Sequence, residues 1–451
     1  IFRAYDIRGI VGDNLSDQDS YLIGQAIGTE ALIQGEEQVI VGYDGRLSSP
    51  LLTKQLMQGL ISTGCDVIDI GMQPTPVVYY AAHTLKTQTA VIVTGSHNPI
   101  NYNGFKIMIA GDTLALEQIQ ALKQRIEQTN FLAGQGVITQ QNIVSQYLNF
   151  IEKDIRLQKK LHVVIDCGNG VTGNIAPLLF KNLGCQVVTL YGEINGHFPN
   201  HHPDPSNPKN LIDLIARVKS EKADIGLAFD GDGDRVGIVT NQGHIIYSDK
   251  ALMLFAKDVL SRNPQAQIIF DVKCSNRLTH LIKQHDGKPL MWKTGHSLIK
   301  KKMKETNALL AGEMSGHFFF KERWFGFDDG LYSAARLLEI VSQDNKTTEQ
   351  LFSLFNDTIS TPEITVPVVE HRKFEIIEAL KNRTHWGAGK ITTLDGFRID
   401  YPKSWGLIRA SNTTPMLVLR FEADDATTLI ATKNIFRQQL AAVAPEITLS
   451  F

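Results

Sequence analysis

The stretch DIGLAFDGDGDR, residues 224–235, joins an apolar run to three aspartates at alternate positions. Its first part is typical of a buried strand. Asp230, Asp232 and Asp234 follow that strand at once, with only glycine between them. Carboxylates this close repel one another and take up protons unless a cation compensates them. The sequence therefore places a charged loop at the carboxyl end of a strand, where α/β proteins carry their binding sites.

The same order of strand, helix, strand and polar loop occurs three times along the chain. Apolar runs rich in Val and Ile, separated by amphipathic segments, predict βαβ units around a largely parallel sheet. We expect the chemistry in the second polar loop of each copy. The paired runs are residues 38–46 and 89–99, then 162–170 and 224–235, then 267–275 and 308–317.

The chain follows a different pattern from about residue 361. A strand-like run, EITVPVV, precedes a helix-like run, KFEIIEALKN, and further short strands follow. Alternation through FRIDY, with Asp395-Gly396 just before it, indicates antiparallel pairing. We predict a smaller C-terminal α+β domain here.

Composition narrows the class of protein. The chain has 451 residues, of which 43% are hydrophobic and 20% charged, and its formal net charge is −2. This profile is that of a globular protein without the basic excess that nucleic acid or an anionic membrane surface attracts. The four cysteines form no CxxC pair, which argues against a zinc ribbon or a disulfide scaffold and favours the reducing cytoplasm.

The three aspartates predict a magnesium site. In a strand-like conformation alternate residues point to one side, so these carboxylates can converge on one hard cation. An EF-hand calcium loop fails, because Arg235 stands where it needs Gly and Asn241 where it needs Glu. A Rossmann fingerprint fails as well, because Val236 replaces its third Gly. The remaining alternative is a solvated acidic turn.

The loop TGSHNPINYNGFK, residues 94–106, offers a nucleophile. Ser96 is not in a G-x-S-x-G elbow, and the chain contains no P-loop motif. A serine beside a magnesium site can accept and donate a phosphoryl group. His97 and Lys106 are the nearest groups able to neutralise phosphate or move a proton. An ordinary polar turn is the alternative.

Two further loops suggest contacts with a phosphosugar. GEMSGH carries Glu313, Ser315 and His317 at alternate positions, which suits vicinal sugar hydroxyls. Its alternative is a polar hairpin before the run FFFKER. RASNTTP, residues 409–415, supplies a guanidinium, hydroxyls, an amide and backbone N–H groups, which by composition form a phosphate cradle. A capped turn is its alternative.

Taken in order, TGSHNP, DGDGDR, GEMSGH and RASNTT resemble the four loops of the α-D-phosphohexomutase superfamily. GEMSGH and the opening FRAYDIRG, residues 2–9, resemble its bacterial phosphomannomutase/phosphoglucomutase branch. The resemblance covers essentially the whole chain, with no departure at any motif position. It implies an α/β protein with three related βαβ mixed-sheet domains and a smaller C-terminal α+β domain around a central cleft. We expect the domains at residues 1–140, 141–245, 246–356 and 357–451.

The resemblance also implies roles for individual residues. Ser96 is expected to be the phosphoserine, and its phosphate oxygen completes a Mg²⁺ shell with Asp230, Asp232 and Asp234. The residues expected to act in catalysis are Ser96, Arg8, His97, Lys106 and His296. Those expected to contact the substrate are Tyr5, Arg235, Lys273, His296, Glu313, Met314, Ser315, Gly316, His317, Arg409, Ala410, Ser411, Asn412 and Thr413.

The implied activity is the interconversion of hexose 1-phosphate and hexose 6-phosphate, with mannose, glucose or both as the sugar. Phosphorylated Ser96 would give its phosphoryl group to the sugar and so form a hexose 1,6-bisphosphate, which also serves as activator. After this intermediate turns in the cleft, Ser96 would accept the other phosphate of the bisphosphate. Lys106, His296 and Arg8 all remain candidates for the general base. We expect a monomer that binds phosphosugars, and a fourth domain that closes over them. The rivals are a phosphatase and a binding protein for sugar phosphates or divalent metals.

Overall fold

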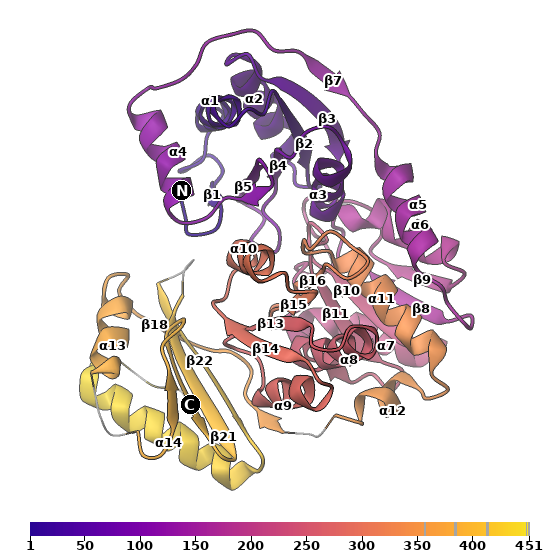
Figure 1. Cartoon of the computed structure of the whole chain (residues 1–451), viewed down its shortest axis with the longest axis vertical. Coiled ribbons are helices and arrows are strands. Elements are labelled where there is room, and N and C mark those ends of the chain that lie inside the picture. The colour runs from indigo at the N-terminus through magenta and orange to yellow at the C-terminus, as the bar shows by residue number, and fades with distance from the viewer. Residues whose placement is uncertain (356–357, 383–385, 412–414, 448, 450–451) are drawn as a thin grey trace.

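The computed structural model describes residues 1–451 except 356–357, 383–385, 412–414, 448 and 450–451. The described strands form four sheets that follow one another along the chain. We call the bodies built on them domains 1 to 4. Figure 1 shows them in an arc that runs from indigo through magenta and orange to yellow, which brings domain 4 round to face domain 1. This is the predicted fold class.

Domain 1 has a mixed sheet in the order β1-β5-β4-β2-β3-β7, with β6 beside β5. Strands β4, β2, β3 and β7 are parallel, whereas β5 runs antiparallel to both β4 and β1. Its elements are β1 (Ile7–Ile10), α1 (Asp17–Ile33), β2 (Gln38–Tyr43), α2 (Ser49–Ile61), β3 (Asp66–Met72), α3 (Thr75–Thr84), β4 (Ala90–Val93), β5 (Tyr102–Ile109), β6 (Asp112–Thr113), α4 (Glu117–Glu127) and β7 (Ile138–Gln140).

Domain 2 has the order β12-β11-β10-β8-β9. Strands β9, β8 and β10 are parallel, and β11 returns antiparallel to β10. Every residue of β10 is buried, as the apolar run IGLAF predicts. Its elements are α5 (Val144–Asp154), β8 (His162–Asp166), η1 (Val171–Asn174), α6 (Ala176–Asn182), β9 (Gln186–Leu190), η2 (Pro208–Leu211), α7 (Ile212–Glu221), β10 (Ile225–Phe229), β11 (Val236–Thr240) and β12 (Ile245–Ile246).

Domain 3 has the order β14-β13-β15-β16. Strands β14, β13 and β15 are parallel, and β16 returns antiparallel to β15. Its elements are α8 (Ser248–Arg262), β13 (Gln267–Asp271), α9 (Asn276–Gln284), β14 (Lys288–Trp292), α10 (His296–Thr306), β15 (Leu310–Gly312), β16 (Phe318–Phe320), α11 (Gly330–Gln343) and α12 (Thr348–Phe352).

Domains 1 to 3 share one arrangement of strands that positions the predicted loops. In each, a buried strand pairs in parallel on one side and with the next strand of the chain, antiparallel, on the other. The serine loop joins β4 to β5, the aspartate loop joins β10 to β11, and GEMSGH joins β15 to β16. The chemistry therefore lies at the same topological position three times.

Domain 4 is the predicted antiparallel α+β unit. Its order is β17-β22-β21-β20-β19, with β18 also beside β22, and every described pairing is antiparallel. Its elements are β17 (Ile359–Ser360), β18 (Ile364–Pro367), α13 (Arg372–Lys381), β19 (Lys390–Thr392), β20 (Phe397–Tyr401), β21 (Ser404–Ala410), β22 (Met416–Ala423) and α14 (Ala426–Val443).

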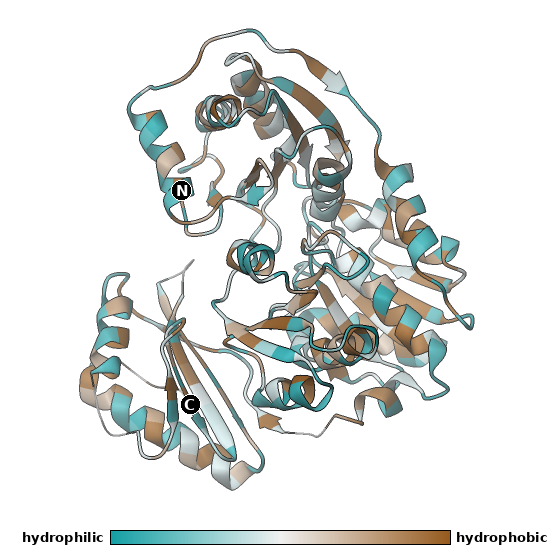
Figure 2. Cartoon of the chain, in the orientation of Figure 1, coloured by the Kyte–Doolittle hydropathy of each residue, from teal (hydrophilic) through white to brown (hydrophobic). Residues whose placement is uncertain are grey.

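The cores join domains 1 to 3 and leave domain 4 separate. One buried cluster runs from Ile40 in domain 1 through Ile165 in domain 2 to Phe318 in domain 3. Domain 4 has a core of its own around Trp386 and Phe436. Figure 2 shows the strands of the sheets as largely hydrophobic and the outer helices as mixed. Among the described residues, no helix has both the length and the apolar character to cross a membrane.

Candidate active site

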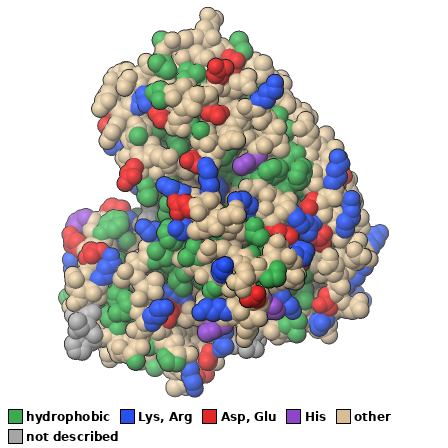
Figure 3. All heavy atoms as spheres, viewed as in Figure 1, with side chains coloured by type: hydrophobic (Ala, Val, Ile, Leu, Met, Phe, Trp, Pro, Cys, Tyr) green, Lys and Arg blue, Asp and Glu red, His purple; other side chains and the backbone are tan. Residues whose placement is uncertain are grey.

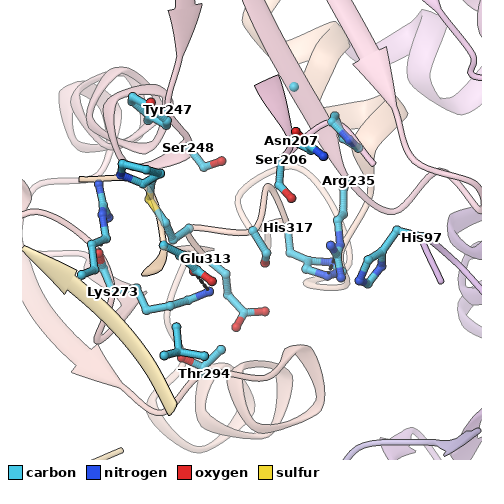
Figure 4. Close-up of a pocket in the computed structure, with 18 of the residues that line it drawn as sticks. His97, Ser206, Asn207, Arg235, Tyr247, Ser248, Lys273, Thr294, Glu313 and His317 are labelled. Carbon is cyan, nitrogen blue, oxygen red and sulfur yellow. Dashed lines mark hydrogen bonds and ion pairs between the residues drawn. The ribbon is translucent and has the colours of Figure 1, made fainter. Parts of the chain in front are cut away.

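A cleft of about 540 Å³ opens where the four domains meet. Figure 3 shows a notch on this face of the molecule between domains 1 and 4, with Lys and Arg side chains along it. Each domain supplies residues that line the cleft, and Figure 4 labels ten of them. The predicted residues among the lining are Arg8, His97, Arg235, Lys273, His296, Glu313, Met314, Ser315, His317, Arg409 and Ser411.

Other predicted residues lie behind this lining. Ser96, Lys106 and the three aspartates are buried and stand outside the lining, whereas Arg8, His97 and Arg235 belong to it. Tyr5, Gly316 and Ala410 also stand outside the lining. Asn412 and Thr413 lie outside the described residues. The structure thus brings together the loops of all four domains.

Ser96 has an unusual backbone for a serine. Its φ is +47°, in the left-handed region that costs a side-chain-bearing residue about 1–3 kcal/mol. Its N–H donates to Thr94 Oγ1 at 2.8 Å. In this conformation its Oγ donates to Asp230 Oδ2 at 2.8 Å, and His97 Nδ1 lies 3.2 Å away. The serine loop therefore presents its hydroxyl to the aspartate loop.

The three aspartates converge through a turn, which corrects the strand-like arrangement predicted from alternation. Residues 230–235 link β10 to β11, and Gly233 has a φ of +78°. All three carboxylates are fully buried, and one oxygen of each lies within 4.8 Å of the others. The turn forms because β11 must return beside β10, and a straight strand would carry Asp234 away.

Lys106 compensates part of this charge. Its ammonium donates to Asp232 Oδ2 at 2.7 Å and also contacts Asp234. Burial alone would lower the pKa of Lys106, but the two carboxylates outweigh it and raise that pKa well above its ordinary value. Burial, Asp232 and Asp234 together raise the pKa of Asp230, whereas Lys106 overcomes burial and lowers the pKa of Asp232.

The aspartate group can hold a divalent metal ion. Asp232 Oδ1 and Asp234 Oδ1 are buried and have no hydrogen-bond partner among the described residues. Leaving such oxygens unpaired in the interior is costly. Three carboxylate oxygens beside a hydroxyl are hard ligands of the kind that Mg²⁺ takes, with its other positions left to water or phosphate. The donor set therefore fits this cation.

Glu313 and His317 belong to the turn between β15 and β16. This is the polar hairpin that the sequence left as an alternative, and its side chains nevertheless face the cleft. Glu313 Oε1 accepts from Gly295 N at 2.6 Å, and burial raises the pKa of Glu313. Arg235 Nε donates to His317 Nε2 at 2.9 Å, which ties the sugar loop to the aspartate loop.

Arg409 reaches the cleft from the end of a strand. Arg409 and Ala410 are the last residues of β21, so the predicted cradle begins inside a strand. The guanidinium Nε lies 3.2 Å from Asp395 Oδ2, and Asp395 also accepts from Thr294 N at 3.0 Å. Domain 4 thereby meets the loop of domain 3 that carries His296.

Two further cationic side chains, Lys273 and Arg8, line the cleft. Lys273 Nζ lies 2.7 Å from Glu363 Oε1. Arg8 Nη1 donates to Asn98 Oδ1 at 3.1 Å, and the same guanidinium contacts Asp6. Tyr5 OH donates to Thr294 O at 2.8 Å and so joins domain 1 to domain 3. Lys273, Arg8 and Arg409 thus line a space suited to an anionic ligand.

Sequence reasoning missed several residues of the site, among them Thr75 and Asp328. Thr75, at the start of α3, donates its hydroxyl to Asp232 Oδ2 at 2.6 Å. Asp328 Oδ2 lies 3.1 Å from His317 Nδ1, and Lys300 donates to the same carboxylate at 2.9 Å. Neither stands in a motif with a chemical signature, although the adjacent acids Asp328 and Asp329 were a signal worth noting.

The four domains each match a family model. Residues 1–133, 145–243 and 247–358 match the phosphoglucomutase/phosphomannomutase alpha/beta/alpha domains I, II and III, and residues 363–438 match the C-terminal domain. The chain belongs to the phosphoglucomutase/phosphomannomutase family. The predicted membership of the α-D-phosphohexomutase superfamily and of its bacterial branch is confirmed.

Individual relatives of this phosphohexomutase match nearly its whole length. A phosphomannomutase/phosphoglucomutase of Pseudomonas aeruginosa is 64% identical over 451 residues, which are 100% of this chain and 97% of the relative. A phosphoglucomutase of Neisseria meningitidis is 51% identical over 441 residues, 97% of this chain and 96% of the relative. A crystal structure of a phosphoglucomutase/phosphomannomutase family protein from Burkholderia thailandensis superimposes with a TM-score of 0.96 and 48% sequence identity. The match covers 100% of this chain and 99% of the Burkholderia chain.

Proposed function

We propose that Ser96 is the phosphoryl carrier of this phosphohexomutase. The enzyme is an isomerase that interconverts hexose 1-phosphate and hexose 6-phosphate. The observation that carries the assignment is the contact of Ser96 Oγ with Asp230 Oδ2 at 2.8 Å, because it places the hydroxyl on the edge of the metal-binding group. His97, whose Nδ1 lies 3.2 Å from the same hydroxyl, lines the cleft together with Arg8 and Arg235.

The reaction has two phosphoryl transfers that mirror each other. A free hydroxyl of the hexose phosphate attacks the phosphorus on Ser96; the new P–O bond forms as the bond to Ser96 Oγ breaks, and a hexose 1,6-bisphosphate results. After the intermediate turns in the cleft, Ser96 Oγ attacks its other phosphate. This restores the phosphoserine and releases the isomer, so phosphate is neither gained nor lost.

Asp230, Asp232 and Asp234, with the oxygen on Ser96, would hold Mg²⁺. When bound, Mg²⁺ stabilises negative charge on the transferring group. Lys106, which donates to Asp232, and Arg235, which lies near Asp230, add positive charge from the protein side. Catalysis of this kind rests on positioning and electrostatics rather than on protein covalent chemistry beyond the serine.

Among the candidates for the general base, the structure favours His296. Burial lowers the pKa of His296 well below its ordinary value, so the imidazole is neutral at pH 7 and can take a proton. It lines the cleft, and its buried Nδ1 lies 3.6 Å from Asp328 Oδ2, which leaves Nε2 as the nitrogen to take the proton. The ammonium of Lys106 contacts Asp232 and Asp234 and stands outside the cleft lining, and a guanidinium such as that of Arg8 does not give up its proton in proteins.

Binding in two orientations needs a second phosphate site. Arg409, Ser411 and Lys273, with Asn412 and Thr413, would hold whichever phosphate is not reacting. Glu313, Ser315 and His317 would take hydroxyls that the two orientations share, with Met314 beside them. A site that does not read the configuration at C2 would accept both glucose and mannose. We also propose a monomer located in the cytoplasm, with domain boundaries at residues 140, 245 and 356.

The test is Ser96→Ala, assayed with glucose 1-phosphate and mannose 1-phosphate plus a trace of the bisphosphate. We expect loss of nearly all isomerase activity with an unchanged thermal midpoint. Ser353→Ala, which alters an exposed hydroxyl just after α12, is the control and keeps full activity. Undiminished activity in folded Ser96→Ala would defeat the proposal. Free phosphate released faster than isomer would favour the phosphatase, and binding without turnover would favour the binding protein.

A further inference from the structure

The guanidinium of Arg46 is buried beneath the serine loop. Arg46 follows β2, and only 2% of it is exposed. Its Nη2 donates to Ser96 O at 2.8 Å, and its Nη1 donates to Pro99 O at 2.6 Å and Tyr102 O at 3.0 Å. A third segment of the same loop, Asn98, offers its carbonyl oxygen to Nη2. The Arg46 side chain thus donates hydrogen bonds to carbonyl oxygens along the loop from residue 96 to residue 102.

These contacts act on the residue with the strained backbone. Ser96 keeps a φ of +47°, which a serine adopts only where its surroundings impose it. Arg46 bonds the carbonyl oxygen of Ser96 itself, and the carbonyl direction depends on that backbone conformation. Charge-assisted hydrogen bonds to several oxygens from one rigid, planar group are well suited to fixing such a loop.

The neighbouring residues are arranged around the same group. A Cβ at Gly95 would lie 2.3 Å from Arg46 Nε, so only glycine lets the guanidinium lie against the loop. Asp44 Oδ2 is 3.4 Å from Arg46 Nε and accepts from Thr94 Oγ1 at 2.8 Å and Gly95 N at 3.0 Å. Asp44 therefore binds donors of the loop while Arg46 binds its acceptors.

We propose that Arg46 is a positioning residue for phosphoryl transfer, which holds Ser96 in the conformation that aims its Oγ at the aspartate loop. The inference rests on the proposed role of Ser96 as phosphoryl carrier. The substrate side of the cleft is built by other residues, among them Glu313, Lys273 and Arg409. Arg46 therefore affects the rate of transfer and leaves sugar binding intact.

The test compares Arg46→Lys and Arg46→Ala with the parent enzyme in kcat and KM. We expect kcat to fall at least a hundredfold in both and KM to stay within about threefold, because an ammonium cannot serve carbonyls spread from residue 96 to residue 102. Guanidinium ion, at concentrations that leave the enzyme folded, should restore activity at least fivefold in Arg46→Ala. Gly95→Ala, which displaces the guanidinium by another route, should reproduce the fall in kcat.

The matched control is Arg336→Ala, which removes another fully buried arginine whose partners are Glu322 and Asp258 in domain 3. It should lower the thermal midpoint without lowering kcat in the folded protein, and guanidinium should not raise its activity. The inference is overturned if folded Arg46→Lys keeps kcat within threefold, or if activity in the Arg46 variants falls only in step with the unfolded fraction. An inactive Ser96→Ala beside an active Arg46→Lys would overturn this inference alone, whereas an active Ser96→Ala would overturn the proposed function.

Discussion

Lys106 carries a large share of the charge balance at the site. Three buried carboxylates converge in the aspartate loop, and Lys106 contacts two of them. Removing one partner of a buried ion pair costs about 3–5 kcal/mol, because the remaining charge stays buried without compensation. A divalent ion can also neutralise this buried negative charge, so Lys106 and the metal ion both stabilise the three carboxylates.

Lys106→Met tests this sharing. We expect the metal-free variant to have a clearly lower thermal midpoint than the parent, and Mg²⁺ to raise that midpoint more in the variant than in the parent. Differential scanning fluorimetry with EDTA or Mg²⁺ measures both. Lys304→Met is the control, because Lys304 pairs with Asp112 at the surface, where an ion pair contributes about 0–1 kcal/mol. An equal Mg²⁺ shift in Lys106→Met and the parent would refute the argument.

At the residue scale, the sequence predicted site residues that share one loop and missed contacts between residues far apart in the chain. Ser96, Asp230, Asp232 and Asp234 were all found from local patterns. Thr75 reaches Asp232 from 157 positions away in the chain, and only the packing of domain 1 on domain 2 brings it there. No spacing rule contains such a contact.

At the scale of elements, each of domains 1 to 3 carries its candidate site residues in the loop between a buried strand and the antiparallel strand that follows it. The serine loop and the aspartate loop approach so closely that a Cβ at Gly231 would lie 2.4 Å from Ser96 O. In the sequence, Gly231 is visible only as a spacer between Asp230 and Asp232. Its second use, the close approach of two loops from different domains, is visible only in the fold.

Gly231→Ala should push the two loops apart. We expect kcat to fall at least tenfold and the free energy of unfolding to drop by about 1–3 kcal/mol, as for other overpacked sites. Gly226→Ala is the matched control: its Cβ would meet Val218 Cγ2 at 2.7 Å, away from the loops, so stability falls and kcat stays. Equal kcat in the two variants would show that the approach of the loops is not needed.

Helix α11 begins at a buried acid that should make stability depend on pH. Asp329 caps the helix by accepting from Tyr332 N at 2.8 Å, and Tyr147 OH donates to the same carboxyl at 2.9 Å. Burial raises the pKa of Asp329 to about 7. The folded state therefore holds a proton that the unfolded state has lost above about pH 4, and stability is lost as pH rises toward 7.

Asp329→Asn should flatten this pH dependence. The amide can still cap the helix, and it does not ionise. Urea unfolding at several pH values between about 4.5 and 7.5 should show that the free energy of unfolding of the parent, relative to that of the variant, falls by up to about 1.4 kcal/mol per pH unit. Asp112→Asn, at the surface, serves as control. Parallel curves for the parent and Asp329→Asn would contradict the assignment.

At the scale of the whole molecule, domain 4 is a body with its own hydrophobic core. Its core is separate, and it meets domain 3 through a small cluster of Val272, Trp405 and Leu407. Polar contacts such as Ser275 Oγ to Glu422 at 2.5 Å add to this junction.

Substrate should therefore draw domain 4 toward domain 1. We expect small-angle X-ray scattering to show a lower radius of gyration when hexose 1,6-bisphosphate and Mg²⁺ are present. Arg409→Ala, which removes the guanidinium of the phosphate cradle, should abolish that change while the free protein keeps the same radius. A radius that does not respond to ligand in the parent would mean that binding needs no closure.

The four-domain architecture followed from repetition in the sequence, because three copies of one pattern and a different tail were visible before any coordinates. The shape of the aspartate loop did not follow. Alternation favoured an extended strand, whereas the antiparallel return of β11 imposes a turn. Pairing between neighbouring strands, which a single apolar run does not encode, decided the local structure.

Isolated phosphorylated enzyme, mixed with hexose 1-phosphate in a single turnover, tests the central claim most directly. Mass spectrometry should show the peptide containing Ser96 losing one phosphoryl group while hexose 1,6-bisphosphate forms, at a rate no slower than kcat. The account fails if isomer appears while the phosphoryl group remains on Ser96, or if the phosphoryl group is found on another residue.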